Sequence, residues 1–544
     1  MIGKIMRGTA AIAASVFLII ASLLSLGNPG RDASPDTAAL QKKLNQLDPS
    51  GVVVAADNGV AKVTTNINEL PLTDNPDLYA YDDPGSVVTM YVTVRRGNDL
   101  ENTNHTWKDV NNATKFFFEN MEHVTVPKAE AILQIGDENG PLPGELGYDS
   151  RAPNATISIR GNSTSLSPQK SYKIMLFDGS GEWRGQKTIN LNKSVFDPTR
   201  VRNKLSFDLL KGLPNIVTLR TQFVHLYVKD ETTDPPSQVF EDYGLFTQIE
   251  MPNKRFLKNH LLDRYGQLYK AIMFEFYRYP DKLRLADDPL YDEKAFSTVL
   301  EIQGNKDHTK LLEMLDDVNN YAIPIEQTFE KYFDQDNYFT WMAFNILMEN
   351  VDTNAQNFYL YSPQNGEKWY FIPWDYDGAL DRQDDVGYDI HPYEQGVSTY
   401  WPVVLHQRVL MVPEYRQKLD DKINEIRAYL TPERLTQMLD IYRPVTEKYV
   451  SQMPDLLYYP RPLDDFDYVY SLIPQEPEVN YQLYLESLES PMPFYLDTPV
   501  YSADKLRFSW GEAYDFNSQD IEYHFRLAAD WDFTNIISEH VLTN

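Results

Sequence analysis

Residues 334–350 are the segment that most restricts how this chain can fold. The sequence DQDNYFTWMAFNILMEN places aromatic and aliphatic side chains on almost every side of a helix, and Asp336 is placed to cap its start. A helix that is apolar all round is stable only when other elements bury it. The chain therefore needs a large core around this helix, and its 544 residues are enough to supply one.

The order of strand and helix patterns along the chain predicts an α+β fold. Strand-like segments rich in β-branched and aromatic residues begin at Ser86 and recur at 129–135, 155–159, 171–177 and 222–229. From about Lys254 onward, amphipathic helical patterns dominate, including those within 407–455. Strands first and helices later, with one interposed hairpin, are typical of a two-lobed α+β arrangement.

Both ends of the chain are predicted to lie outside a main domain at 85–495. Residues 1–27 have a positively charged start, an apolar run and a Gly/Pro break, as a signal peptide or an uncleaved anchor has. Residues 28–84 are polar, which predicts a linker with one short helix at 37–47. Residues 496–544 alternate apolar and polar side chains and predict a partial all-β sandwich of the immunoglobulin or fibronectin type. We therefore expect an exported protein that touches a membrane only through its N-terminal segment.

Composition excludes several classes of function. The formal charge of −29 leaves too few cations to neutralise nucleic-acid phosphates, whereas it suits a solvated extracellular protein, a divalent metal or a basic polypeptide partner. The absence of cysteine removes disulfide scaffolds, thiol nucleophiles and cysteine–zinc sites. The nine histidines show no HExxH or HxH spacing, so we expect no zinc site built from histidine.

Residues 349–380 contain the parts that phosphoryl transfer requires. Asp352 follows the apolar helix, Asn357 lies five positions further on, and a strand–turn–strand pattern leads to Asp375. A phosphotransferase needs one carboxylate to accept the proton of the attacking hydroxyl, and an amide oxygen and a second carboxylate to hold Mg²⁺. We therefore predict that Asp352 is the base and that Asn357 and Asp375 are metal ligands. Each motif is common by chance when it stands alone, so the prediction depends on their combination.

A glycine-containing turn at residues 160–170 is a candidate phosphate-binding element. Backbone N–H groups around Gly161, with the hydroxyl of Ser163, could cradle phosphate oxygens, and a lysine on the following strand could neutralise them. Glu250, which ends an apolar strand, could pair with that lysine as in a kinase ion pair. For this segment alone, an ordinary hairpin with solvated lysines is the simpler interpretation.

Taken together, these motifs resemble the CotH family, the spore coat protein H group of atypical secreted protein kinases. They follow in the family's order as IRGNSTSLSPQKSYKIMLFD (159–178), LNKSVFDPTRVRNKL (191–205), YGLFTQIE (243–250), NVDTNAQNFYLY (350–361) and WYFIPWDYDGAL (369–380). The resemblance covers about residues 85–495. It implies a divergent two-lobed protein-kinase-like fold that uses ATP with Mg²⁺ or Mn²⁺ to phosphorylate Ser or Thr of secreted or cell-surface proteins.

The resemblance also implies a role for individual residues. Asp352 falls at the catalytic aspartate, and Asn357 and Asp375 fall at the metal ligands. Six residues are implied to contact the nucleotide: Arg160, Asn162, Ser163, Lys170, Glu250 and Trp374. Lys173 is the second choice for the lysine assigned to Lys170. The expected substrate is a protein, basic and Ser-rich. The family is best known from spore coats, but the export signal and the C-terminal module favour a bacterial envelope or extracellular location.

Two other classes of function stay open on the sequence. A catalytically silent surface-binding protein on a kinase-like fold would use the linker and the C-terminal module, but it has no need of Asp352, Asn357 and Asp375 together. A glycoside hydrolase would use Asp352 with Asp375 or Asp377 as paired carboxylates, which leaves Asn357 unexplained. Dependence on ATP and a divalent metal separates the kinase from both.

Overall fold

The computed structural model describes residues 53–57, 60–64, 72–80, 82–114, 126–380, 391–502 and 504–543. The chain divides into two compact units, Met1–Glu69 and Leu70–Asn544. In the first unit the described residues are an antiparallel hairpin of β1 (Val53–Asp57) and β2 (Val60–Thr64). The predicted signal segment 1–27 and the predicted helix at 37–47 lie outside the described residues. Among the helices within the described ranges, none has the length and hydropathy needed to span a membrane.

The first half of the second unit is a closed ring of β-strands. The sheet order is β3-β9-β10-β8-β7-β6-β4-β5, and a further pairing of β3 with β4 joins the first seven strands end to end. The strands are β3 (Val87–Arg95), β4 (Ala129–Asp137), β5 (Gly140–Pro141), β6 (Ala155–Arg160), β7 (Ser171–Leu176), β8 (Thr188–Asn192), β9 (Thr221–Asp230) and β10 (Glu241–Glu250). The strands expected from the sequence are present, but their closure into a ring was not predicted.

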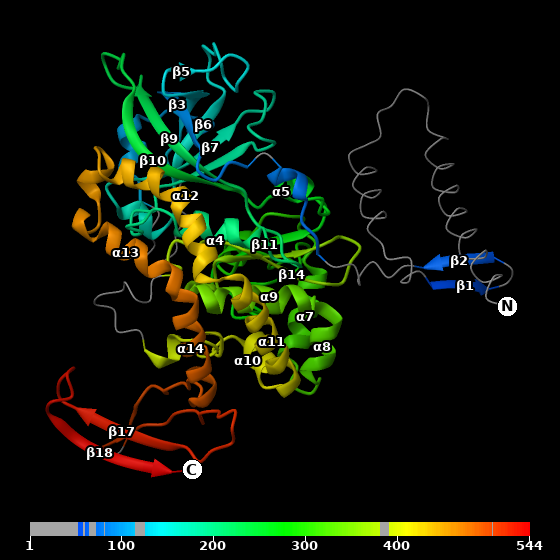
Figure 1. Ribbon diagram of the computed structural model, residues 1–544. Helices are drawn as coiled ribbons and strands as arrows, with labels where there is room; N and C mark the ends of the chain where they lie inside the picture. Colours follow the sequence, from blue (N-terminus) through cyan, green and yellow to red (C-terminus); the bar gives the residue numbers. More distant parts are fainter. Residues whose placement is uncertain are drawn as a thin grey trace. The chain divides into compact units, whose positions relative to one another are not determined.

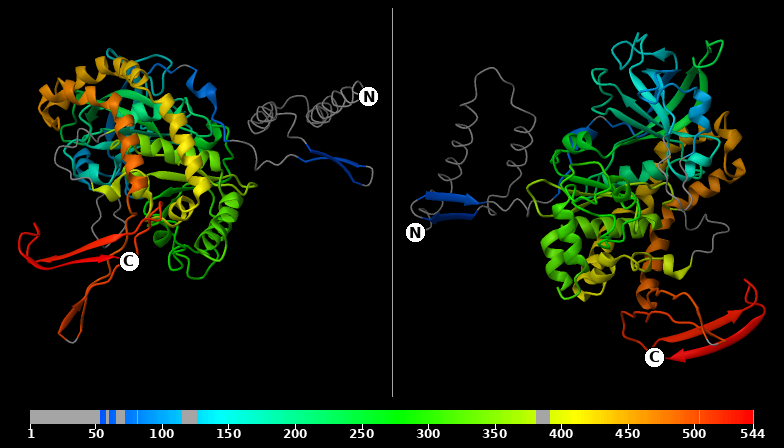
Figure 2. Two further views of the ribbon diagram at one scale, coloured as in Figure 1. Left: turned by 60° about the horizontal axis from the view of Figure 1, so that its bottom comes forward. Right: turned by 180° about the vertical axis from the view of Figure 1, so that it is seen from behind.

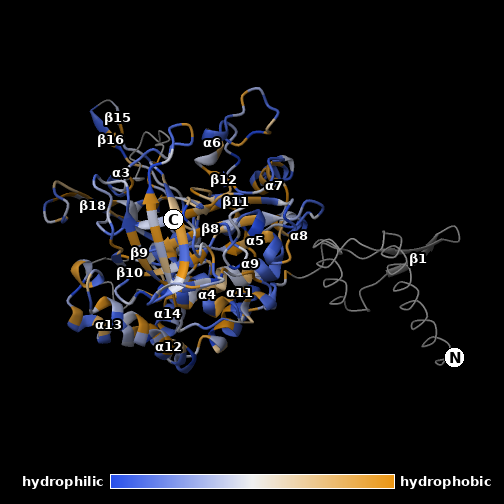
Figure 3. Ribbon diagram, turned by 90° about the horizontal axis from the view of Figure 1, so that it is seen from above, coloured by the Kyte–Doolittle hydropathy of each residue, from blue (hydrophilic) through white to orange (hydrophobic). Residues whose placement is uncertain are grey.

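Side chains alternate between the inside and the outside of this ring. Along β6, every second residue (Ala155, Ile157 and Ile159) is buried in a core cluster formed by residues between Met90 and Phe246. Figure 3 shows hydrophobic residues along the central strands with hydrophilic residues around them. Because the period of a strand is two residues, the half-buried polar side chains of β6 and β7 lie on the outer face of the ring.

The second half of this unit is mainly helical and contains a second sheet. Its antiparallel strands have the order β12-β11-β13-β14, with β11 (Gln267–Ala271), β12 (Leu300–Ile302), β13 (Phe358–Ser362) and β14 (Tyr370–Pro373). The helices of eight or more residues after the ring are α7 (Thr309–Asn319), α8 (Ile325–Tyr332), α9 (Gln335–Met348), α11 (Pro413–Tyr429), α12 (Pro432–Val450) and α14 (Glu476–Glu489). Shorter helices are α3 (Trp107–Asn112), α5 (Lys254–Asn259), α6 (Glu293–Ser297), α10 (Val404–Leu410) and α13 (Phe466–Leu472), and α4 (Arg202–Leu210) lies between β8 and β9. Figures 1 and 2 show the ring strands gathered in one part of the unit and α7, α8, α10 and α11 in the other, which confirms the α+β class.

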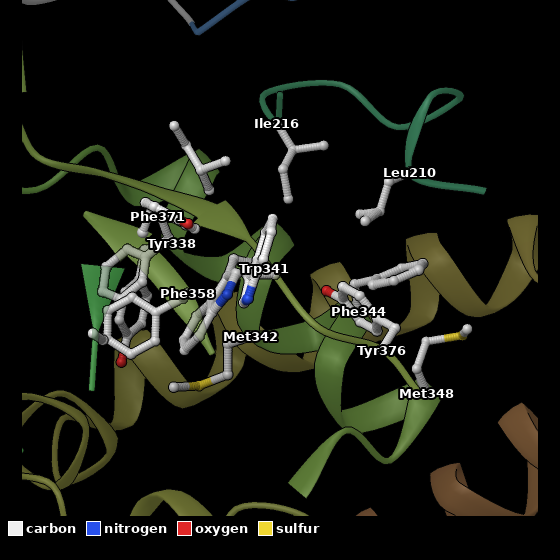
Figure 4. Packing of buried hydrophobic residues seen from close by; sticks show 14 of the residues in the cluster. Leu210, Ile216, Tyr338, Trp341, Met342, Phe344, Met348, Phe358, Phe371 and Tyr376 are labelled. Atoms are coloured by element: carbon white, nitrogen blue, oxygen red, sulfur yellow. The ribbon is translucent and has the colours of Figure 1, made fainter. Parts of the chain in front are cut away.

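The apolar helix predicted from the sequence is α9, and it lies in the main core. All residues from Asn337 to Met348 are buried. Asp334, and not Asp336, caps the helix, because its side chain accepts a hydrogen bond from the backbone N–H of Asn337 at 2.8 Å. Figure 4 shows Trp341 and Phe344 of α9 in the same cluster as aliphatic side chains from α4 and the loop after it.

The second unit begins earlier than the predicted domain boundary at residue 85. Leu72 is buried in the main core, and the Asp74 carboxylate pairs with the buried imidazole of His260, with 2.5 Å between Oδ1 and Nδ1. Residues 72–80 and 82–84 therefore belong to the folded unit and are not part of a linker. The boundary could not be predicted from the sequence, because single contacts make the attachment and create no periodic pattern: the side chain of Leu72, the Asp74–His260 and Asp82–Lys211 ion pairs, and a hydrogen bond from Asn75 to the carbonyl of Asn259.

Residues 496–543 contain two separate hairpins. One joins β15 (Val500–Ser502) to β16 (Lys505–Arg507), and the other joins β17 (Glu522–Ala528) to β18 (Ile536–Thr543). The alternation seen in the sequence at 521–527 is thus a strand, as predicted. The partial sandwich itself stays a prediction.

Candidate active site

Asp352 lies in a short 3₁₀ turn, η5 (Val351–Thr353), directly after α9. Glu349 ends α9 in the left-handed conformation with φ 48°, which turns the chain away from the helix axis. The side-chain amide of Asn350 then donates to the backbone carbonyl of Asp375 at 2.9 Å, and Thr353 Oγ1 donates to the carbonyl of Asn350 at 2.6 Å. These bonds fasten η5 to the end of β14 and bring Asp352 beside Asp375, as the sequence predicted.

Asn357 precedes β13 and Asp375 follows β14, so both residues lie at the open end of the β13–β14 hairpin. Phe358 pairs with Pro373, so Asn357 and Trp374 are the next residues along the two chain segments, and Asp375 comes one position later. Asn357 has φ 56° and Asp375 has φ 60°, which is the left-handed region. For residues other than glycine this conformation costs about 1 kcal/mol or more and persists where surrounding contacts impose it, often at functional sites. The hairpin therefore presents an amide and a carboxylate from a constrained backbone.

Asp352, Asp375 and Asp377 form a cluster of mutually repelling carboxylates. The charge of Asp375 raises the pKa of Asp377 well above its usual range, and burial and Asp352 add to the effect. Loss of surrounding water raises the pKa of Asp352, and the charge of Asp375 raises it further. A divalent cation relieves such repulsion.

The donor set fits Mg²⁺ or Mn²⁺, which prefer oxygen ligands. Within the described ranges, no group of three or more His, Asp and Glu side chains is arranged to hold a metal ion. An ion held here by Asp375 and Asn357 would keep positions for water and phosphate oxygens, as Mg²⁺ in nucleotide sites does.

Tyr376 anchors the carboxylates on either side of it. Its ring is buried, 5.3 Å from the ring of Phe207 and 5.7 Å from that of Phe344, and Figure 4 shows it beside Phe344. Its backbone N–H donates to Asn203 Oδ1 at 2.8 Å. Asp375 and Asp377 are thereby held on a short segment whose middle residue is fixed in the core.

Two cations lie over the buried ring of Trp374. The guanidinium of Arg160 is 5.7 Å from the ring centroid, and the ammonium of Lys270 is 5.6 Å from it. The edge of the ring faces Tyr359 at 5.3 Å. Trp374 is only 3 % exposed, so it supports these cations. It does not offer the open face that a nucleotide-pocket wall requires, which corrects the predicted role.

Lys173, not Lys170, lies on the same face as Arg160. Lys173 pairs across the ladder with Ser158 of β6, two residues before Arg160, so all three side chains are on the outer face of the ring. Burial lowers the pKa of Lys173, and the charge of Glu301 opposes that effect. Lys170 precedes β7 and donates to the carbonyl of Ser165 at 2.5 Å, which closes the turn. The preference for Lys170 is therefore reversed.

The predicted glycine turn is present between β6 and β7. Gly161 has φ 81°, and a Cβ there would lie 2.0 Å from Thr164 Oγ1, so this position requires glycine. Asn162 and Ser163 are exposed on the turn, and Ser165 Oγ donates to the carbonyl of Asn162 at 2.5 Å. The exposed pair lies next to Arg160 in the chain and is accessible to a ligand.

Glu250 does not pair with a phosphate-binding lysine. Its buried carboxylate accepts from Arg220 at 2.6 and 2.9 Å and from His260 at 3.1 Å. In the ladder Glu250 is opposite Ile189, whereas Lys173 is opposite Asn190. Neighbouring positions on a strand point to opposite faces, so Glu250 and Lys173 lie on different sides of the sheet. This part of the prediction is wrong.

The sequence interpretation missed two residues of the second sheet. Lys270 of β11 pairs across the ladder with Glu301 of β12 on one side and with Tyr359 of β13 on the other. Burial lowers the pKa of Lys270, while the charges of Glu301 and Asp375 oppose the effect. A lysine between the buried residues Tyr269 and Ala271 of one strand was the available signal.

Comparison with known proteins identifies the family of this chain. A family model described as CotH kinase protein matches residues 157–482, from β6 to α14, a range that contains every site residue named above. Inner spore coat protein H of Bacillus subtilis (strain 168) is 26% identical over 295 residues, which cover 52% of this chain and 73% of that protein. The match extends over well over half of the chain and includes both the ring strands β6–β10 and the helical part. The chain belongs to the CotH kinase protein family.

Proposed function

We propose that this chain is an atypical protein kinase that transfers the γ-phosphate of ATP to Ser or Thr hydroxyls of secreted or cell-surface proteins, with Mg²⁺ or Mn²⁺. The observation that carries the proposal is the convergence of Asp352, Asn357 and Asp375 at one end of the β13–β14 hairpin. The description of the family as a kinase family supports phosphoryl transfer. In this interpretation, the ring and the helical part are the two lobes of a divergent kinase-like fold.

The three site residues differ in exposure in a way that suits different roles. Asp352 is the most exposed of the three, so it can reach the hydroxyl of a polypeptide substrate, and its raised pKa suits a general base. Asp375 and Asn357 are half-buried and would hold the metal ion, with Asp377 as a further oxygen donor. When bound, the ion neutralises charge on the phosphates.

The proposed location and substrate class rest on the relative and on the charge of the chain. The relative is named as a protein of the inner spore coat. For this chain we propose a place in the spore coat, the cell envelope or the extracellular space, with a basic, Ser-rich protein as the acceptor of phosphate. The net charge of −29 supports a basic partner.

The test is incubation of the full chain with γ-labelled ATP, Mg²⁺ or Mn²⁺, and a basic Ser-rich protein. Labelled phosphoserine or phosphothreonine should appear with wild-type protein and be lost with Asp352→Asn. A metal-dependent rise in the melting temperature on addition of ATP should accompany transfer. A wild-type protein that shows neither transfer nor this rise would instead support the silent binding protein.

A further inference from the structure

The short turn η8 (Asp455–Tyr458) exposes a run of large apolar side chains. Its first residue, Asp455, is buried, but the other three residues are all exposed. The run is held in place, because the Asp455 carboxylate pairs with Lys193 at 2.7 Å and accepts a hydrogen bond from the backbone N–H of Leu245 in β10 at 2.8 Å. Consecutive apolar side chains that are fixed in contact with water are typical of an interaction surface.

The loop after β8 brings a further exposed apolar residue to this turn. Phe196 is 60 % exposed. On one side of it, Lys193 forms the ion pair with Asp455, and on the other side the carbonyl of Pro198 accepts a hydrogen bond from the hydroxyl of Tyr459 at 2.9 Å. Since the loop is attached on both sides of Phe196 to η8 and the residue after it, Phe196 lies beside η8.

The turn between β6 and β7 reaches the same place. Gln169 Nε2 lies 3.5 Å from Asp455 Oδ1, and Leu166, three residues earlier in the chain, is exposed. Three segments that are far apart in the sequence therefore bring exposed apolar residues together around one buried carboxylate. We call these residues the apolar surface: Leu166, Phe196, Leu456, Leu457 and Tyr458.

The apolar surface adjoins the end of the active site that carries Asp377. Asp197 follows Phe196, and its charge is one of those that raise the pKa of Asp377. The Asp197 carboxylate also accepts a hydrogen bond from the backbone N–H of Arg202 at 3.0 Å, which attaches the loop to α4. Through Asn203, α4 in turn holds the backbone next to Asp377. A polypeptide on the apolar surface would therefore continue toward the carboxylate cluster.

Carboxylates follow the apolar surface in the chain. Asp464 is exposed and Asp465 is half-buried in the turn η9 (Leu463–Asp465). Neither of them forms an ion pair with another residue in the described part of the chain. Uncompensated carboxylates near exposed apolar side chains favour a ligand that carries Lys or Arg beside large apolar residues, and the net charge of −29 acts in the same direction.

We propose that the apolar surface docks a segment of the acceptor protein in which large apolar residues stand beside Lys or Arg. The docked segment would deliver the Ser or Thr to the active site from the side of Asp377. The docking rests on the proposed function and adds to it a second contact with the substrate, away from the reacting hydroxyl. Such a contact raises the affinity for the substrate and leaves the chemical step unchanged.

Two fluorescent peptides test the docking. Both are lysine-rich and contain one serine, but the first carries a leucine–phenylalanine pair that two alanines replace in the second. Their binding to the full chain is followed by fluorescence anisotropy without ATP, and wild-type protein should bind the first peptide about tenfold more tightly. Leu457→Ser should weaken binding of the first peptide about fivefold or more and leave that of the second unchanged.

Two further variants test the other parts of the surface. Phe196→Ser should also weaken the first peptide selectively, and it keeps the docking testable if Leu457→Ser does not fold. Asp464→Asn should weaken both peptides about twofold at low salt, because both carry the lysines, and the effect should fade as salt is added.

Leu290→Ser is the matched control. Leu290 is 69 % exposed, close to the 60 % of Leu457, and it lies in a loop of the helical part away from the apolar surface. Its substitution removes the same side chain, so the affinities for both peptides should stay at the wild-type values. Melting temperatures of all variants show whether they are folded.

The outcomes separate the docking from the proposed function. If wild-type protein binds both peptides equally, or if Leu457→Ser behaves as Leu290→Ser does, the docking is wrong, and the kinase stands if phosphate is transferred to the serine. In transfer assays, Leu457→Ser should raise KM for the first peptide at unchanged kcat, whereas a fall in kcat alone would overturn the docking. If the first peptide binds through Leu457 but wild-type protein transfers no phosphate to any peptide or protein, the docking stands and the proposed function fails.

Discussion

Two clusters of charged side chains in the second unit balance their charges in opposite ways. In the first, the His260 imidazole lies between the carboxylates of Asp74 and Glu250, at 2.5 and 3.1 Å, and Arg220 pairs with Glu250 at 2.6 Å. In the second, Asp352, Asp375 and Asp377 repel one another, and the nearby cations make no ion pair within the described residues.

The difference distinguishes a structural charge cluster from a ligand site. Burial opposes charge in both clusters, but in the first the partners outweigh it: the pKa of His260 rises to about 9 and that of Glu250 falls to about 2. In the second cluster, the charge of Asp375, the burial of the group and the charge of Asp352 act in the same direction and raise the pKa of Asp377. A protein retains uncompensated charge where an absent ligand supplies the balance. The predictions below ask whether each cluster behaves accordingly.

The largest expected effect is on catalysis. Asp352→Asn should lower the rate of phosphoryl transfer by about 10²–10⁴, because it removes a group that acts on the attacking hydroxyl in the transition state. Metal-dependent ATP affinity should stay near the wild-type value. Asp375→Asn should lose both, because the metal then lacks its main ligand. Transfer rate and ATP affinity are measured on each folded variant, and near-normal transfer by Asp352→Asn would remove the case for a base in this loop.

Substitution of a residue in the paired cluster should lower the stability of the protein and leave its ATP binding unchanged. Glu250→Gln leaves Arg220 and His260 short of a buried partner and should reduce the free energy of unfolding by about 3–5 kcal/mol. Denaturant unfolding measures the loss. Any protein that remains folded should bind ATP with unchanged affinity, and a selective loss of ATP binding without destabilisation would restore the predicted nucleotide role of Glu250.

The same cluster should make stability depend on pH above neutrality. Since the folded-state pKa of His260 is raised to about 9 from an unfolded value of about 6.5, its contribution is complete below pH 6.5 and is lost as pH rises through 9. The decline should be at most about 1.4 kcal/mol per pH unit in this window. Unfolding is followed against pH for wild type and for His260→Asn; identical slopes in the two proteins would show that His260 is not the titrating group.

The smallest expected effect is a gain in stability, whereas the preceding predictions are losses. Asp377→Asn removes one of the repelling carboxylates and should stabilise the metal-free protein by about 1 kcal/mol. The gain should shrink or reverse when Mg²⁺ and ATP are present, because the ion then loses an oxygen donor. Melting temperatures with and without Mg²⁺ and ATP measure both. Destabilisation of the metal-free variant would mean that Asp377 is already compensated, as Glu250 is.

The parts of the molecule that depend on local pattern could be predicted from the sequence. The alternation of apolar residues in β6 and the apolar surface of α9 follow from the periods of a strand and a helix, so both elements were expected. The closeness of Asp352, Asn357 and Asp375 could also be predicted, because a helix end and a short hairpin are local structures that bring these three residues together.

The pairing of strands that are far apart in the sequence decided the features that could not be predicted. The choice of Lys173 over Lys170, and the placement of Glu250 on the other side of the sheet, depend on strand register, in which a shift of one residue exchanges the faces. Lys270 and Glu301 became visible only when β11, β12 and β13 were aligned. The sequence by itself determined many of the local elements and placed Asp352, Asn357 and Asp375 around one hairpin. The tertiary structure decided which charges are paired and which are left for a ligand, because that balance depends on distances between segments far apart in the chain.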